Sequence, residues 1–441
     1  MSTFKAWVQI ASLRSVLFPI TLAAGLSAAA GAVWAQSVPR SPQDAGGDAT
    51  VEPGPGDTVM ERARPGYDPV GIRAGGFFIY PEVGVTEFYR SNIFYTPSNE
   101  EDDFITVVSP AVRAKSNWNV HGLSFYAEAD YGHYLLNEDE NYLDFRSGVD
   151  GHLDIRHDLR VLGGLSVAHL HESRSSPEQT GADEPVTYMR YSGNAAVEKD
   201  FSRLSTRLGG DVQVYRDNDV DAVGGGTFNS DDRDRTESEA ALRLGYELTP
   251  RVEPFVRASV NDRSYRQRRD DFGQVRDSWG WETVAGAAFD LGGVTFGEVY
   301  VGYLQQNYEG AGLKNVSGPS FGAEVVWNPT ELTTVTVGAE RGVEETTLAG
   351  ASGALQSSFD ARVDHELRRN LILSANTGFT RRDYRGISRT DDLADIGASL
   401  RFLTNRFLEM RAGYSFSTRD SSASGNDYDA HTISVGVTAK F

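Results

Sequence analysis

The chain has 441 residues, a formal net charge of −20 and no cysteine. A mean hydropathy of −0.39, with no long apolar stretch after the N-terminus, excludes a helical inner-membrane protein. The acidic balance argues against a nucleic-acid binder, and the absence of cysteine is compatible with an oxidising compartment.

The N-terminus has the parts of a secretory signal peptide. Lys5 and Arg14 precede an alanine-rich apolar run, and the residues up to Ala35 fit a small-x-small cleavage site. We therefore expect residues 1–35 to be cleaved off on export. The alternative is an uncleaved anchor helix, which Pro19 and the cleavage site disfavour.

Residues 36–73 are rich in Pro, Gly and acidic residues and show no hydrophobic period. Such a segment buries too little apolar surface to fold, so it predicts a disordered linker. From residue 74 to residue 441 the composition is uniform, which predicts a single domain.

That domain alternates apolar and polar residues, a pattern typical of strands with a different environment on each face. In the last run the apolar residues are Ile433, Val435, Val437, Ala439 and Phe441, with polar or small residues between them. The polar faces carry Arg and Glu singly among Gly and Ser, which favours a wet lumen over the core of a soluble sheet. A soluble propeller or solenoid is disfavoured because no motif repeats.

Short turns and long polar connections alternate between these runs. Turns lie at 156–158, 249–251 and 404–406, whereas the connections at 172–184 and 216–235 are long. This asymmetry is typical of an outer-membrane barrel with short periplasmic turns. We predict an all-β, transmembrane, antiparallel up-and-down β-barrel over residues 74–441, with about eighteen strands and sixteen as the alternative. The predicted strands are 76–90, 103–116, 120–134, 141–155, 158–172, 185–199, 202–216, 234–248, 251–265, 275–290, 293–308, 315–328, 331–345, 355–368, 370–384, 390–404, 406–418 and 428–441.

An even strand number places Phe441 at the periplasmic rim, on the same side as the linker. A terminal aromatic residue on such a strand resembles the signal that the barrel-assembly machinery reads. We therefore interpret Phe441 as an assembly signal. The expected location is the outer membrane of a Gram-negative bacterium, in contact with its lipid and lipopolysaccharide.

The opening of the domain carries a family resemblance. Arg64-Pro-Gly-Tyr-Asp-Pro-Val-Gly leads into the first strand, Ser91-Asn-Ile-Phe follows it, and Ser109-Pro110 lies in the second strand. These motifs resemble the Putative beta-barrel porin 2 family, and the likeness extends less distinctly over most of residues 64–441. The resemblance implies an outer-membrane barrel without catalytic residues, some relatives being associated with exopolysaccharide export. Proline inside a strand should interrupt the ladder of hydrogen bonds.

The sequence has no catalytic, phosphate-binding or zinc motif, so we predict no enzyme, no cofactor and no metal site. His169 and His171 are interpreted as polar rim residues, with metal ligation or lipid hydrolysis as alternatives. The acidic run at 217–221 lacks the glycine and glutamate offsets of a calcium loop. It is interpreted as a solvated loop that meets the divalent cations bridging lipopolysaccharide.

The polar parity of the strands predicts the lumen face. Charges of both signs occur there, which suits either a rigid network of ion pairs or a hydrated conduit for a polar solute. The candidate pore-lining residues are Glu128, Asp130, Arg190, Arg207, Asp211, Arg243, Arg257, Glu282, Glu324, Arg362, Arg401, Glu409 and Arg411.

These observations favour a passive outer-membrane channel. The leading hypothesis is a conduit for exopolysaccharide secretion, whose partners would be the polysaccharide and periplasmic export proteins. One alternative is a general or solute-selective diffusion porin. Another is a closed structural or adhesive barrel that acts through its acidic loops.

Overall fold

The computed structural model describes residues 56–179 and 181–441, so the predicted signal peptide and the linker up to residue 55 lie outside the described residues. The chain forms one antiparallel sheet of nineteen strands, of which the short β1 (Ile72–Ala74) pairs with β2 alone. The other eighteen close into a barrel, which confirms the predicted fold. They are β2 (Phe77–Arg90), β3 (Asp103–Ser116), β4 (Gly122–Tyr134), β5 (Tyr142–Arg156), β6 (Leu159–His171), β7 (Thr187–Phe201), β8 (Leu204–Asp217), β11 (Arg235–Tyr246), β12 (Val252–Tyr265), β13 (Ser278–Asp290), β14 (Thr295–Tyr308), β15 (Val316–Thr330), β16 (Thr333–Glu345), β17 (Gly353–Arg368), β18 (Leu371–Arg385), β19 (Thr390–Asn405), β20 (Leu408–Ser421) and β21 (Tyr428–Lys440).

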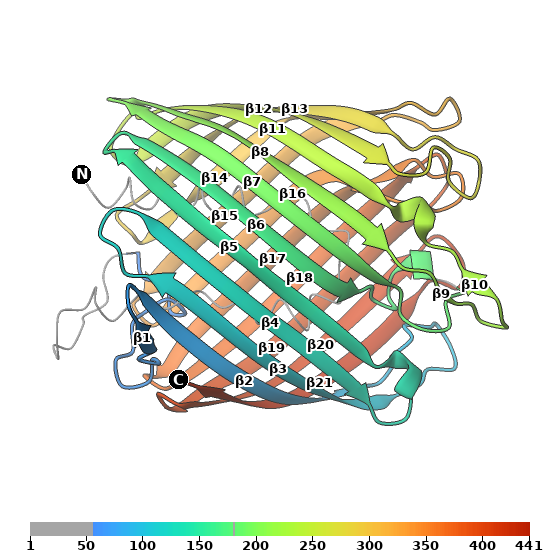
Figure 1. Cartoon of the computed structure of the whole chain (residues 1–441), viewed down its shortest axis with the longest axis horizontal. Coiled ribbons are helices and arrows are strands. Elements are labelled where there is room, and N and C mark those ends of the chain that lie inside the picture. Colours follow the sequence, from blue (N-terminus) through green and yellow to red (C-terminus); the bar gives the residue numbers. More distant parts are fainter. Residues whose placement is uncertain (1–55, 180) are drawn as a thin grey trace.

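The first and last strands close the barrel. β2 pairs with β21 from Glu82↔Lys440 to Arg90↔Thr432, and every other barrel strand pairs with its neighbours in sequence. Figure 1 shows the strands strongly tilted, with β1 and the C-terminus at the same end of the barrel. Because an even number of antiparallel strands returns the chain to its starting side, this is the arrangement that the strand count requires.

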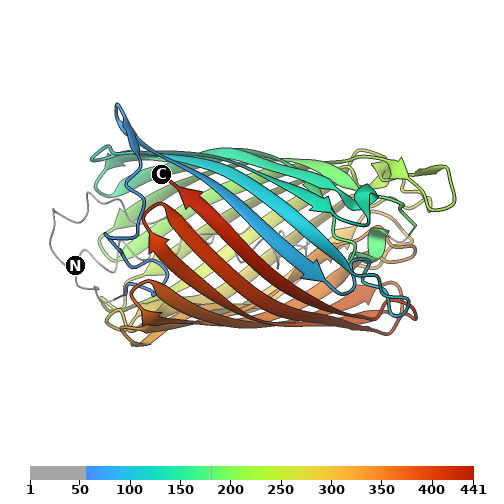
Figure 2. The same cartoon turned by 90° about the horizontal axis from the view of Figure 1, so that it is seen from below.

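The two ends of the barrel differ in their connections (Figure 2). At one end, called the turn end, short turns join the strands, as between Phe201 and Leu204. At the other, called the loop end, long connections carry the 3-10 turns η2 (Glu138–Glu140), η3 (Pro177–Gln179) and η4 (Asp231–Arg233) and the β9–β10 hairpin (Val220–Asp221, Thr227–Phe228). Within the described ranges, no helix is long and apolar enough to cross a membrane.

Side chains sort by strand parity as predicted. On β21, Ile433 and Val435 are more than half exposed on the outer face, whereas Lys440, on the opposite face, is buried. Apolar residues on the outside satisfy contact with lipid, and the polar face is turned inward. Phe441 follows β21 at the turn end, where its amide donates to the Pro81 carbonyl at 3.1 Å and its ring lies 6.5 Å from that of Phe407.

The strand prolines mark interruptions of the ladder, as expected for residues without an N–H. Between β3 and β4 the pairing passes from Val108↔Tyr131 to Ala111↔Glu128 and omits Pro110. Pro81 lies just before the first β2–β21 pair.

Candidate functional site

All the predicted pore-lining residues lie on the inward face of their strands, as the pairing registers show. Arg207, Arg243 and Arg257, for example, stand directly opposite one another on β8, β11 and β12. Arg243 also contacts Glu298 of β14 at 2.6 Å, although two strands lie between β11 and β14. Side chains can meet in this way only across the concave interior of the barrel.

Many of the inward charges neutralise one another within the wall. Arg146 of β5 lies 3.5 Å from Glu128 and 3.6 Å from Asp130, and Arg207 lies 2.6 Å from Glu198 of β7. Opposite charges held close in a restricted volume attract strongly and rigidify the wall. Further pairs of this kind are Arg257–Glu282 at 3.2 Å and Arg362–Asp364 at 2.9 Å.

Three further predicted residues form one cluster near the turn end. Glu409 is fully buried and accepts from Arg401 at 2.9 Å, from Arg411 and from Lys440 of β21. The last contact ties β20 to β21 beside the closure of the barrel. This position indicates a structural role for the cluster.

The other predicted residues have different surroundings. Among the described residues, neither Asp211 of β8 nor Arg190 of β7 forms an ion pair, and both face the lumen. Glu324 of β15 stands opposite Glu298 on the inner wall.

The lumen is narrowed near the loop end by the end of the β16–β17 hairpin. Arg263 of β12 forms an ion pair with Glu345 of β16 and donates to the Val343 carbonyl at 3.2 Å. Four strand spacings separate β12 from β16 along the wall, about 19 Å. The contact therefore requires the hairpin end to lie inside the barrel.

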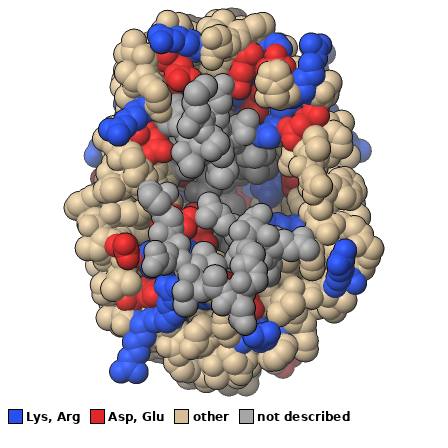
Figure 3. Space-filling model, turned by 90° about the vertical axis from the view of Figure 1, so that its left-hand side faces the viewer, with Lys and Arg blue, Asp and Glu red and all other residues tan. Residues whose placement is uncertain are grey.

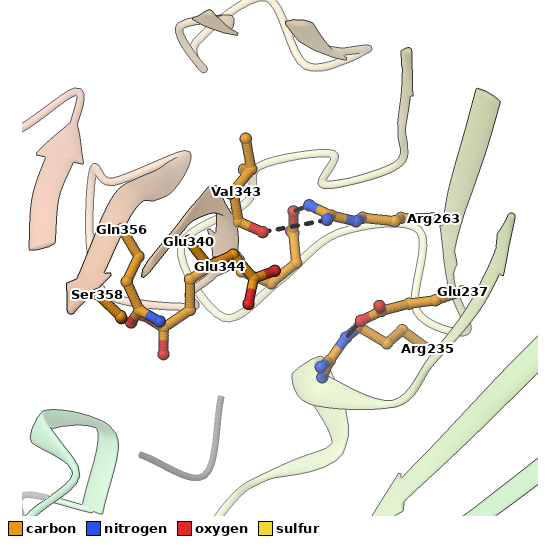
Figure 4. A pocket seen from close by; sticks show the side chains of 10 residues that line it. Arg235, Glu237, Arg263, Glu340, Val343, Glu344, Gln356 and Ser358 are labelled. Atoms are coloured by element: carbon orange, nitrogen blue, oxygen red, sulfur yellow. Dashed lines mark hydrogen bonds and ion pairs between the residues drawn. The ribbon is translucent and has the colours of Figure 1, made fainter. Parts of the chain in front are cut away.

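The same narrowing encloses a cavity of about 30 Å³ that charged groups surround from several strands. Figure 4 shows Arg263, Glu237 and Arg235 on one side and Glu340, Glu344 and Gln356 on the other. Its lining holds a 2.6 Å ion pair between Arg235 and Glu237, and Glu344 pairs with Arg382 at 2.8 Å. A solute crossing the barrel here meets fixed charges of both signs.

The connection between β6 and β7 crosses the loop end. Its Ser175 carbonyl accepts from Arg419 of β20 at 2.6 Å, on the far side of the β2–β21 closure. Farther along, Glu178 accepts from the Thr346 hydroxyl at 2.5 Å and the Thr347 amide at 2.9 Å. The connection thus bridges the mouth and contacts the tip of the β16–β17 hairpin.

Buried charges hold this bridge in place. Arg233 of η4 lies 2.7 Å from Glu172 and 3.8 Å from Glu178. Burial raises the pKa of Glu172, since the nearby Arg233 only partly offsets the loss of water. Burial acts on Glu178 in the same direction, but Arg233 and the two threonine contacts outweigh it and lower the pKa of Glu178. Burial and the nearby Asp271 raise the pKa of Asp232, also in η4, to about 6.

A short segment at the turn end, residues 56–68, folds into the barrel opening, and we call it the strap. Its Val59 amide donates to the Thr334 hydroxyl at 2.9 Å, and its Arg62 and Arg64 lie 3.4 and 2.9 Å from Glu366 of β17. Both arginines are at least 95 % buried. The predicted linker was expected to be disordered up to residue 73, but its described part makes these defined contacts.

The motif Arg64-Pro-Gly-Tyr-Asp from the family resemblance closes the strap. The Asp68 amide donates to the Arg64 carbonyl at 2.8 Å, and the Asp68 carboxylate accepts from the Arg64 amide. The Arg64 side chain continues to the Arg369 carbonyl at 3.1 Å. The motif is thus a turn that aims an arginine into the barrel.

A second cavity lies in the barrel opening at the turn end. It has a volume of about 670 Å³ and lies against the turns of β5–β8 and the ends of β11 and β12, and its lining includes Arg160, Arg207 and Glu253. Figure 3 shows this end with both charge signs around the rim.

Sequence reasoning missed the strap, Arg263 and Glu345. One signal was present for the hairpin: Arg341 and Glu345 fall on the apolar parity of β16, where lipid contact would exclude charge. Among the described residues, no group of three or more His, Asp or Glu is placed to hold a metal ion. His171 instead lies 2.9 Å from Asp144 and stacks on Tyr142.

The family described as Putative beta-barrel porin 2 matches residues 64–441. No curated protein matches the chain. Similar solved structures include the outer membrane protein opdK of Pseudomonas aeruginosa, with 12 % identity, a TM-score of 0.41 and coverage of 82 % of this chain and 99 % of that one.

A BenF-like porin from Pseudomonas fluorescens has 12 % identity and a TM-score of 0.43, with 82 % of this chain and 99 % of that one covered. At such values these structures carry no argument about substrate. The family match covers the whole barrel, and the chain therefore belongs to the Putative beta-barrel porin 2 family of outer-membrane β-barrel porins.

Proposed function

We propose that this porin is a diffusion channel for small polar solutes and that it prefers cations. The observation that carries the proposal is the narrowing at the loop end, where the β16–β17 hairpin and the β6–β7 connection both enter the path. Fixed charges line this narrow part. A small polar solute can therefore form hydrogen bonds and ion pairs there, whereas a polysaccharide chain has little room to pass.

The preference for cations follows from the balance of unpaired charge on the inner wall. In the described part of the chain, several inward carboxylates form no ion pair, whereas most inward arginines are paired. A surplus of fixed negative charge in a confined aqueous path raises the local concentration of cations and repels anions. Such unpaired carboxylates include Asp150, Asp211, Glu340, Asp360 and Asp395.

The narrowing favours the diffusion porin over the exopolysaccharide conduit, the leading hypothesis from the sequence. A polymer in transit needs a continuous wide path, and here the barrel's own segments occupy the lumen at both ends. The family match does not distinguish the two. The closed structural barrel would share the same fold and differ only in lacking flux.

Swelling of proteoliposomes in isotonic sugars tests the proposal. We expect a pentose to enter quickly, a disaccharide more slowly and a tetrasaccharide hardly at all. Rapid entry of the tetrasaccharide and of longer dextrans would favour the polysaccharide conduit. No swelling beyond that of protein-free liposomes would favour the closed barrel.

A further inference from the structure

The end of the β16–β17 hairpin has left the barrel wall. The ladder between β15 and β16 runs from Thr330↔Thr333 to Gly322↔Glu340 and stops there. Beyond it, residues 316–321 of β15 pair with β14, and residues 341–345 of β16 pair with β17. Residues 316–321 of β15 and residues 341–345 of β16 are therefore not paired with each other. At this place the end of the β16–β17 hairpin overlaps the inner surface of the barrel wall.

The back of the hairpin packs on the inside of the wall. Val343 of β16 and Leu355 of β17 share a buried apolar cluster with Leu304, Tyr308 and Val316 of β14 and β15. By parity, Val343 and Leu355 belong to the same strand face as the lipid-exposed Val337 and Phe359. Val343 and Leu355 are thus apolar on a face that can turn to either side of the wall, whereas Arg341 and Glu345 on the same face of β16 need water or an ion-pair partner in both positions.

Polar contacts hold the hairpin in its inner position. The Tyr265 and Tyr308 hydroxyls donate to Glu345 at 2.8 and 3.0 Å. At the tip, the fully buried Arg276 donates to the Thr346 and Ala351 carbonyls at 2.5 and 3.1 Å. These contacts come from β12, from β14 and from the connection between β12 and β13.

The β15 stretch has the character of an edge. It contains Pro319, and proline in a sheet is confined to edges and bulges because it cannot donate to a ladder. Continuing the register of Gly322↔Glu340 would place Ser320 opposite Gly342 and Gly318 opposite Glu344. Ser320, Gly342 and Gly318 are small and leave room for the strands to approach.

We propose that the hairpin end is a gate that exchanges between the lumen and the wall. In the described state it narrows the channel; in the other state, residues 341–345 of β16 pair with residues 316–321 of β15 and the lumen widens. The ladder gained in the wall offsets the apolar cluster lost inside. The gate regulates the proposed diffusion channel and rests on that function, whereas the movement itself can be tested without any flux.

Paired cysteines report the movement, and the natural chain has none to interfere. Ser320→Cys with Gly342→Cys captures the wall state, and a Cβ at Gly342 meets open space. Gly318→Cys with Leu355→Cys captures the lumen state, since a Cβ at Gly318 would lie 3.3 Å from Leu355 Cδ2. The control is Ser358→Cys with Thr380→Cys, two directly opposed residues of the intact β17–β18 ladder.

Each pair is oxidised in the folded barrel in lipid, and free thiols are counted by the mass added by an alkylating agent. We expect loss of free thiols in the wall pair as well as in the control and lumen pairs. A wall pair that keeps its thiols while the control pair loses them overturns the gate. Gly318→Cys with Glu344→Cys repeats the wall test if the first wall pair does not fold.

Conductance then separates the gate from the channel function. We expect the oxidised wall pair to conduct more than the reduced one and the oxidised lumen pair to conduct least, with reductant reversing both. Cross-linking in the wall without any conductance leaves the movement supported and refutes the channel function. If neither the wall disulfide nor the lumen disulfide changes the conductance, the gate is refuted and the channel function stands.

Discussion

The strap is held in the barrel opening by one buried carboxylate, so replacing that carboxylate should release it. Glu366 is 4 % exposed and faces both Arg62 and Arg64. Glu366→Ala leaves two guanidinium groups buried without their partner. Breaking a buried ion pair in this way costs about 3–5 kcal/mol, which corresponds to a weakening of strap docking by roughly two to four orders of magnitude.

Limited trypsin digestion of the folded barrel measures the release. In the wild type Arg62 is buried, so cleavage before Ala63 should be slow. In Glu366→Ala the strap detaches and the product that begins at Ala63 should appear much faster. Conductance should rise as well, because the strap no longer occupies the opening.

Glu331→Ala is the matched control, since Glu331 lies in a turn beside the strap with an exposed side chain. It offers only its backbone carbonyl to Arg62, which the substitution keeps. The heat-modifiable electrophoretic mobility of both variants should show that each forms a folded barrel. If Glu366→Ala is cleaved before Ala63 no faster than the wild type, the buried ion pairs do not hold the strap.

Three further predictions concern assembly and the loops. Deleting Phe441 should lower the amount of barrel in the membrane, because its amide and ring complete the closure at the turn end; unchanged assembly with altered conductance would contradict this role. Asn92→Ala should lower the free energy of unfolding by about 1–3 kcal/mol, measured in urea, because the fully buried Asn92 amide donates to the Thr96 and Asp429 carbonyls across the closure; an unchanged midpoint would refute it. Because the pKa of Asp232 is raised to about 6, its carboxylate destabilises the folded loop at neutral pH and this penalty disappears as pH falls through 6. Amide exchange around η4, corrected for intrinsic rates, should therefore slow from pH 7.5 to 5, and Asp232→Asn should remove the change; equal pH dependence in both proteins would contradict the assignment.

The barrel could be predicted from the sequence because lipid imposes one simple requirement. Every second residue of a spanning strand must be apolar on the outside, and Ile433, Val435 and Val437 obey it visibly. The same parity located inward residues such as Arg257 and Glu282. Their partners depend on which strand lies opposite at which register, and a single sequence does not contain that information.

The segments inside the barrel were missed for two physical reasons. Val343 continues the apolar parity of a lipid-facing strand, and only Arg341 and Glu345 on the same face of β16 distinguish a position inside the barrel. Arg62 and Arg64 lie in a polar, Pro- and Gly-rich stretch that reads as disordered. They become buried because they form ion pairs with Glu366, which lies on the inner wall about three hundred residues later in the chain.

The central claim is that this barrel is an open channel whose inner wall carries surplus negative charge. The reversal potential of the purified wild type in a planar bilayer, under a gradient of potassium chloride, tests it most directly. We predict stepwise single-channel currents and a reversal potential displaced toward that of potassium. Currents that reverse toward chloride, or no currents at all, would contradict the claim.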